Sequence, residues 1–145
     1  YNPIYKRTKI LYNGEDRIIV EHCKIEIKTH TKGTLSLFHA KGALERINEG
    51  VIVRYPHEGE EVVLSLLEET LTMERHSLSL RFERGKTSFA RLKAGGHEGS
   101  LPLKTKFYSL MRNEDGISAA LKYELGEPAQ KFTLSIRVSP GSEER

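Results

Sequence analysis

Apolar and polar residues alternate along most of this chain, and the alternation limits its fold more than any other feature. Around residue 80, Leu78, Leu80 and Phe82 alternate with polar residues. The same pattern recurs at 117–125 and at 132–138. Because successive side chains of a β-strand point to opposite faces, a period of two gives each strand one apolar and one polar face. The sequence therefore predicts a β-protein whose strands each cover one side of a core.

Short segments rich in glycine, asparagine, aspartate and proline separate the alternating runs. Examples are 31–33, 56–59, 113–116 and 126–128. Glycine and asparagine tolerate the positive φ that hairpin turns require, and proline stops a strand. About nine or ten strands at this spacing predict an antiparallel meander that closes into a barrel or folds as a sandwich. Closure is favoured because it removes unpaired edge strands.

Length and composition indicate one folded domain over residues 1–145. Of the 145 residues, 37% are hydrophobic and 30% are charged, a mix typical of globular domains. We expect residues 1–20 to form an N-terminal extension or an extra strand, and residues 140–145 to form a frayed tail.

No uncharged apolar run approaches the roughly 18 residues of a membrane-spanning helix. The segment 60–73 has a partly helical pattern, but its alternation and its surroundings favour strands.

The second half of the chain has a distinctive order of strands and turns. The features in that order are Gly99, the strand 101–107 with the Lys104–Thr105 pair, an acidic turn ending at Gly116, the strand 117–125 with Tyr123, and a final amphipathic strand at 131–138. Over residues 78–138, and loosely from Lys24, the chain resembles the DUF1934 (YwiB-like) family of bacterial proteins. The resemblance implies a lipocalin-like (calycin) β-barrel of about eight to ten strands. That family has no established activity, so the resemblance implies no catalytic residues.

Residue types that carry catalysis or bind metals occur without a supporting motif. The six histidines and the single cysteine lack the spacing of zinc sites. His22 and Cys23 are neighbours, so in a strand they point to opposite faces. The sequence contains neither a nucleophile elbow nor a phosphate loop followed by a helix. We therefore expect a binding protein rather than an enzyme, with no catalytic residue, metal or cofactor.

Three polar residues are candidates for contacts with a ligand inside the barrel. Thr105 and Tyr123 lie on the apolar parity of their strands. Arg91 is the third, on a strand whose inward parity the sequence leaves open. A few polar groups in an apolar lumen orient a small apolar or amphipathic ligand. The alternative is that Thr105 and Tyr123 satisfy each other or the backbone in a filled core.

Basic residues occupy the polar parity of three successive strands. If these strands pair in order, the basic side chains gather on the outer wall, and Tyr108 shares their parity as a stacking surface. Lysines beside an aromatic ring are one way in which a sheet binds single-stranded nucleic acid. The alternative is a solvated surface, since the net charge is only +3. The basic residues are Lys104, Lys106, Lys122, Lys131 and Arg137.

The leading functional prediction is a non-enzymatic module that binds a small apolar or amphipathic ligand inside the barrel, through Thr105, Tyr123 and Arg91. The alternative is binding of RNA or another polyanion through the basic outer face. We expect a cytoplasmic location. The chain begins with Tyr1 rather than methionine, so the alternative is a signal peptide removed from a longer precursor.

Overall fold

The computed structural model describes residues 8–9 and 18–141, which form strands joined by short turns. The strands are β1 (Thr8–Lys9), β2 (Ile18–Thr31), β3 (Thr34–Ile47), β4 (Gly50–His57), β5 (Glu60–Leu67), β6 (Thr70–Arg75), β7 (Leu78–Glu83), β8 (Thr87–Ala94), β9 (His97–Asn113), β10 (Gly116–Leu125) and β11 (Gln130–Pro140). In the described part of the chain there is no helix, and hence none that could cross a membrane.

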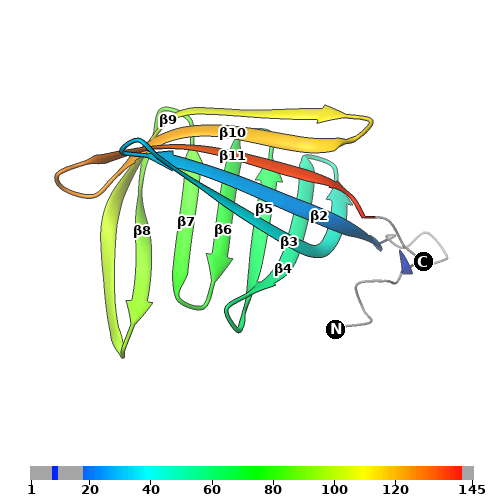
Figure 1. Ribbon diagram of the computed structural model, residues 1–145, viewed down its shortest axis with the longest axis horizontal. Coiled ribbons are helices and arrows are strands. Elements are labelled where there is room, and N and C mark those ends of the chain that lie inside the picture. The colour runs from blue at the N-terminus through cyan, green and yellow to red at the C-terminus, as the bar shows by residue number, and fades with distance from the viewer. Residues whose placement is uncertain (1–7, 10–17, 142–145) are drawn as a thin grey trace.

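Strands β2 to β11 form one closed antiparallel barrel (Figure 1). Each strand pairs with the next along the chain, and β11 pairs back with β2. The predicted all-β meander closed into a barrel is therefore confirmed. The segment 60–73 forms β5 and most of β6, as its alternation predicted. The short β1 pairs with the start of β2, while most of the expected extension at 1–20 and the residues 142–145 lie outside the described residues.

The barrel wall consists of two crossing layers. Figure 1 shows the long strands β2, β3, β10 and β11 running across the shorter strands β4 to β7 behind them. Strand β9 belongs to both layers, because its first part pairs with β8 and its second part with β10. Within the stretch paired with β10, Thr105 pairs with Tyr123 and Phe107 pairs with Lys122, so Lys106 is an extra residue in β9. Such a bulge bends a strand and reverses the faces of the residues that follow.

Inward-facing side chains fill most of the barrel with an apolar core. Along β10, the alternating residues Ile117, Ala119 and Leu121 are buried. Their partners across the ladder, on β11, are Val138, Ile136 and Leu134, and these are buried as well. The period-two pattern in the sequence therefore corresponds to one dry face per strand, and these faces meet inside the barrel.

Two seams in the wall lack continuous strand pairing. Strand β3 pairs with β4 only over Ala43–Ile47, so Thr34–Gly42 pairs with β2 alone. Strand β7 is paired with β8 only at Leu78 and Ser79. At both seams the wall depends on side-chain packing rather than on a hydrogen-bonded ladder.

Gly42 lies where β3 separates from β4, and at this position the backbones of the two strands come very close together. A Cβ atom at Gly42 would lie 2.2 Å from the carbonyl oxygen of Arg54. Because a backbone oxygen cannot move aside cheaply, we expect Gly42→Ala to lower the free energy of unfolding by about 3 kcal/mol in urea denaturation. Gly99→Ala is the matched control, since a Cβ atom there meets nothing within 4 Å. Equal effects of the two substitutions would contradict this description of the seam.

Candidate functional site

The barrel interior contains a cavity of about 290 Å³, at the lower end of the range for ligand pockets. Its lining comes from inward positions of β2 to β7, β10 and β11. The apolar lining residues are Ile27, Phe38, Val62, Leu71, Met73, Leu80, Phe82 and Leu134. The polar or partly polar ones are Thr29, Tyr55, His57, Arg75 and Tyr123. An apolar cavity with a few polar groups is suited to an amphipathic molecule.

Aromatic contacts hold the two lining tyrosines in place. The ring of Tyr123 stacks on Phe132 at 5.0 Å and meets Phe82 edge-on at 4.8 Å. Across the seam between β3 and β4, the ring of Phe38 lies 5.7 Å from Tyr55 and 4.7 Å from His57. Because packing fixes these rings, the tyrosine hydroxyls have defined positions at the cavity.

The hydroxyl groups of Tyr55 and Tyr123 have no hydrogen-bond partner among the described residues, although both side chains are buried. Burial raises the pKa of each tyrosine to about 12, so both hydroxyls stay protonated at neutral pH. A protonated hydroxyl can both donate and accept a hydrogen bond. Neither oxygen is among the enclosed unpaired atoms of the described residues, and both tyrosines line the cavity, so a polar group bound there could accept from or donate to these hydroxyls.

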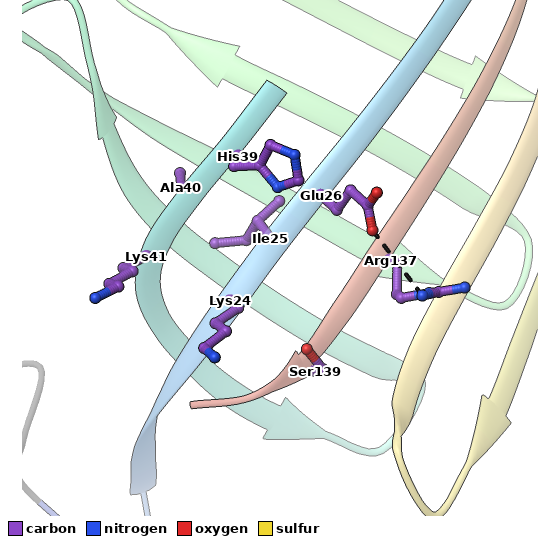
Figure 2. Close-up of a pocket in the computed structure, with 8 residues that line it drawn as sticks. All are labelled: Lys24, Ile25, Glu26, His39, Ala40, Lys41, Arg137 and Ser139. Carbon is purple, nitrogen blue, oxygen red and sulfur yellow. Dashed lines mark ion pairs between the residues drawn. The ribbon is translucent and has the colours of Figure 1, made fainter. Parts of the chain in front are cut away.

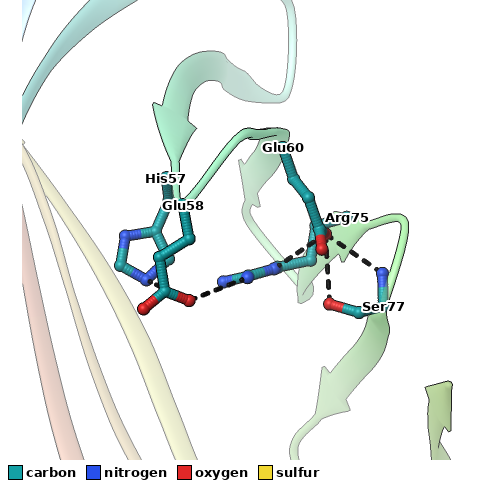
Figure 3. Close-up of polar contacts among 5 residues, drawn as sticks. All are labelled: His57, Glu58, Glu60, Arg75 and Ser77. Atoms are coloured by element: carbon teal, nitrogen blue, oxygen red, sulfur yellow. Dashed lines mark hydrogen bonds and ion pairs between the residues drawn. The ribbon is translucent and has the colours of Figure 1, made fainter. Parts of the chain in front are cut away.

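A chain of charged and polar groups lies at the cavity mouth (Figure 3). Arg75 donates from Nε to Glu60 at 3.0 Å and from Nη2 to Glu58 at 3.4 Å. Glu60 also accepts hydrogen bonds from the backbone N–H and the hydroxyl of Ser77, each at 3.1 Å. His57 Nε2 lies 3.6 Å from the Glu58 carboxylate. These contacts join the β4–β5 turn to the β6–β7 turn.

The network stabilises the ionised forms of Glu60 and Arg75. The hydrogen bond from the Ser77 backbone, aided by Arg75, lowers the pKa of Glu60. Partial burial would lower the pKa of Arg75, but hydrogen bonds and charge from Glu60 and Glu58 outweigh it and raise that pKa. Glu58 has φ of 52° and Gly59 has φ of 80°, the tight-turn conformation that their sequence predicts. The carboxylate of Glu58 is thereby held beside Arg75.

The structure separates the three residues predicted to face a ligand. Tyr123 lines the cavity. Thr105 is buried inside the barrel, and its hydroxyl has no partner among the described residues, but it does not line the cavity. Arg91 is exposed on β8, so its expected place in the barrel interior is wrong. The inward parity of that strand belongs to Ala90, which is buried.

Cavity contacts by Tyr55, His57 and Arg75 were missed from the sequence. Tyr55 and His57 continue the alternation of Val51 and Val53, so their parity could have identified them. Arg75 has the same parity as Leu71 and Met73 on β6. An arginine at the end of a strand is usually solvated, however, so parity alone does not predict that Arg75 lines the cavity. Only the pairing of β5 with β6 brings its guanidinium within hydrogen-bond distance of the Glu60 carboxylate.

The basic residues predicted on the outer wall are all exposed there. They are Lys104, Lys106, Lys122, Lys131 and Arg137. Glu124 pairs with both Lys104 and Lys131, so opposite charges alternate over this end of the wall.

Tyr108 does not join the basic residues on the outer wall, and its expected stacking role is wrong. The bulge at Lys106 turns Tyr108 inward, where it is buried and donates its hydroxyl hydrogen bond to the Leu67 carbonyl. Phe107 is the outward aromatic residue instead, with 41% exposure. The guanidinium of Arg84 lies 5.5 Å from the centre of its ring.

Cys23 is buried in the core next to the close approach of β3. Burial raises the pKa of its thiol to about 12, so the reactive thiolate is scarce at neutral pH. Among the described residues, no group of three or more histidine, cysteine, aspartate or glutamate side chains could hold a metal ion.

Comparison with known proteins supports the fold. The chain is similar to the YwiB protein from Bacillus subtilis, whose crystal structure gives a TM-score of 0.71. The match covers 85% of this chain and 94% of that chain at 16% sequence identity. At this identity the likeness concerns the barrel fold alone. No family model matches the sequence, and no curated protein matches it.

The network at the cavity mouth predicts a specific dependence of stability on pH. The lowered pKa of Glu60 means that its ionised contacts stabilise the fold above the ordinary value of 4.5. This stabilisation is lost as the pH falls through the lowered value. We expect Glu60→Gln to lower the melting temperature at pH 7, with a difference from the native chain that shrinks below pH 4.5.

Thermal unfolding followed by circular dichroism from neutral to acidic pH measures this difference. Glu61→Gln is the matched control, because Glu61 is exposed on the opposite face of β5. A loss of stability in Glu60→Gln that stays constant across the pH range would show that the ionised network does not stabilise the mouth.

Proposed function

We propose that this chain is a YwiB-like barrel that binds a small, neutral, amphipathic molecule in the cavity between its two layers. The observation that carries the proposal is the pair of hydroxyls on Tyr55 and Tyr123: both residues are largely buried and line the apolar cavity, and neither hydroxyl has a hydrogen-bond partner among the described residues. A ligand with a hydroxyl, carbonyl or amide group would supply the missing hydrogen bonds. Its apolar part would contact residues such as Leu71, Leu80 and Leu134.

The charges at the mouth favour a neutral ligand. Arg75 is the permanent cation of the lining, and it already holds the carboxylates of Glu58 and Glu60. Arg75, Glu58 and Glu60 together carry one net negative charge. A carboxylate ligand would have to compete with Glu58 and Glu60 for the guanidinium and would face their repulsion. A neutral polar group meets neither cost.

The seam between β3 and β4 provides a route into the cavity. No strand pairing joins Thr34–Gly42 to β4, so opening this seam breaks no backbone ladder. The contact between Phe38 and His57, at 4.7 Å, spans it from one strand to the other. Rotation of these two rings would admit a ligand at far lower cost than separation of paired strands, because side-chain rotamers change on much faster timescales than strands part.

Removing the two hydroxyls tests the proposal. Octanol is a neutral probe and octanoate is its anionic counterpart of similar size. We expect octanol to bind more tightly than octanoate in isothermal titration. Tyr55→Phe and Tyr123→Phe should each weaken octanol binding about fivefold, the equivalent of one hydrogen bond of about 1 kcal/mol.

Stability provides the control for these variants. The hydroxyls of Tyr55 and Tyr123 bond to nothing in the described protein, so their removal should leave the free energy of unfolding unchanged or raise it. Tyr108→Phe removes a hydroxyl that bonds the Leu67 carbonyl, so it should lower stability by about 1 kcal/mol and leave octanol binding intact. Octanoate binding as tightly as octanol, or equal octanol binding by all variants, would contradict the proposal.

A further inference from the structure

The outer face of the β9–β10–β11–β2–β3 layer, here called the cationic wall, carries a concentrated positive charge. Its outward charged side chains among the described residues are the lysines and arginine Lys24, Lys28, Lys41, Lys104, Lys106, Lys122, Lys131 and Arg137, and the carboxylates Glu26, Glu45, Glu98 and Glu124. These are eight cations and four carboxylates, a local excess of four positive charges, whereas the whole chain has a net charge of only +3. The rest of the chain is therefore net negative, and the positive charge lies mainly on this wall.

Strand register brings the strongest part of the wall together from three strands. Lys24 on β2 pairs with Lys41 on β3 and with Ser139 on β11. In the next outward row, Glu26 pairs with His39 and with Arg137. Lys24 and Lys41 meet across the local β2–β3 hairpin, whereas Arg137 and Ser139 lie about a hundred residues further along the chain and join them only because β11 closes the barrel onto β2.

Lys24 and Lys41 form the least compensated part of this cluster. Like charges placed directly opposite each other on neighbouring strands repel and destabilise the pair. The nearby carboxylate of Glu26 lies 4.0 Å from the guanidinium of Arg137 instead. Figure 2 shows the two lysine side chains extending to the same side, with Ser139 beside Lys24. An anion between the two ammonium groups would relieve their repulsion.

The surface is hollowed at this point. A groove of about 500 Å³ is lined by the two lysines, Glu26, His39, Arg137 and Ser139 (Figure 2), together with parts of the strands beneath them. This volume exceeds that of a single phosphate several times. The ammonium groups, the imidazole and the hydroxyl are hydrogen-bond donors of the kind that bind phosphate oxygens.

We propose that the cationic wall binds the backbone of single-stranded nucleic acid, with one phosphate held in the groove between Lys24 and Lys41. The cations continue from the groove across five strands, which suits a chain of phosphates rather than one anion. The outside of a barrel is convex, so a flexible strand can follow it, whereas a stiff duplex or a flat membrane touches less of it. Phe107, exposed opposite Lys122, adds a ring on which a base can stack.

This inference is independent of the ligand proposed for the interior. The outward groups of the wall point away from the cavity, which is lined by the opposite parity of the same strands. Loss of one activity would therefore leave the other intact, and octanol titration of the wall variants distinguishes the two.

Fluorescence anisotropy with a labelled single-stranded oligouridylate tests the proposal. We expect Lys24→Gln/Lys41→Gln to weaken binding about tenfold. The slope of log affinity against log salt concentration should become shallower by about two, as expected when two phosphate contacts are lost. The matched control is Arg91→Gln/Lys93→Gln, which removes the same charge from exposed positions of β8 outside the wall. The control should retain most of the affinity.

Three results would overturn the proposal. The first is equal weakening by both double variants, which would mean that only overall charge matters. The second is an absence of oligouridylate binding at low salt by the native chain. The third is binding to vesicles of phosphatidylcholine and phosphatidylserine without binding to the oligouridylate, which would make the wall a membrane-facing surface. Melting temperatures of the variants check that each remains folded, as exposed substitutions predict.

Discussion

The ladder between β2 and β11 is the interaction on which the rest of the structure depends. It runs from Cys23–Pro140 to His30–Thr133 and joins the two ends of the meander. Without it, β11 and β2 would be open edges, with unpaired backbone groups and a half-exposed core. With it, the inward faces of all ten strands surround one interior. The closed cavity and the place of Arg137 and Ser139 beside Lys24 and Glu26 follow from this closure.

Closure gives the wall two faces with different chemistry. The interior is apolar, its charged groups are held in the network of Arg75, Glu58 and Glu60, and its spare hydrogen-bonding capacity comes from neutral tyrosine hydroxyls. The exterior of one layer collects cations that no equal number of carboxylates balances. Because neighbouring residues of a strand point to opposite faces, one stretch of β2 contributes Ile25 and Ile27 to the core and Lys24 and Lys28 to the cationic wall. The same fold can therefore hold a neutral amphiphile inside and a polyanion outside.

The sequence predicted the strands well because alternation is a local property, and turns such as Glu58-Gly59 have local signatures. What failed depends on pairing between strands. Tyr108 was assigned to the outer wall because alternation was extended through Lys106, where one extra residue reverses the faces. Leu35 and Leu37 alternate like core residues, yet both are more than half exposed, because the inward parity of β3 belongs to Phe38. The mouth network and the Lys24–Lys41 pair need the register of neighbouring strands, which single-strand patterns do not contain.

The proposed role of the barrel cavity is to hold a neutral amphipathic molecule. Native mass spectrometry of the chain purified gently from its own host tests this most directly, because a bound molecule is retained and weighed with the protein. We expect an adduct of one small, uncharged molecule per chain, which is lost on denaturation and reduced in the Tyr55→Phe/Tyr123→Phe variant. An adduct that is anionic, or one that persists unchanged in that variant, would contradict this role. So would a chain that carries no adduct and leaves octanol unbound.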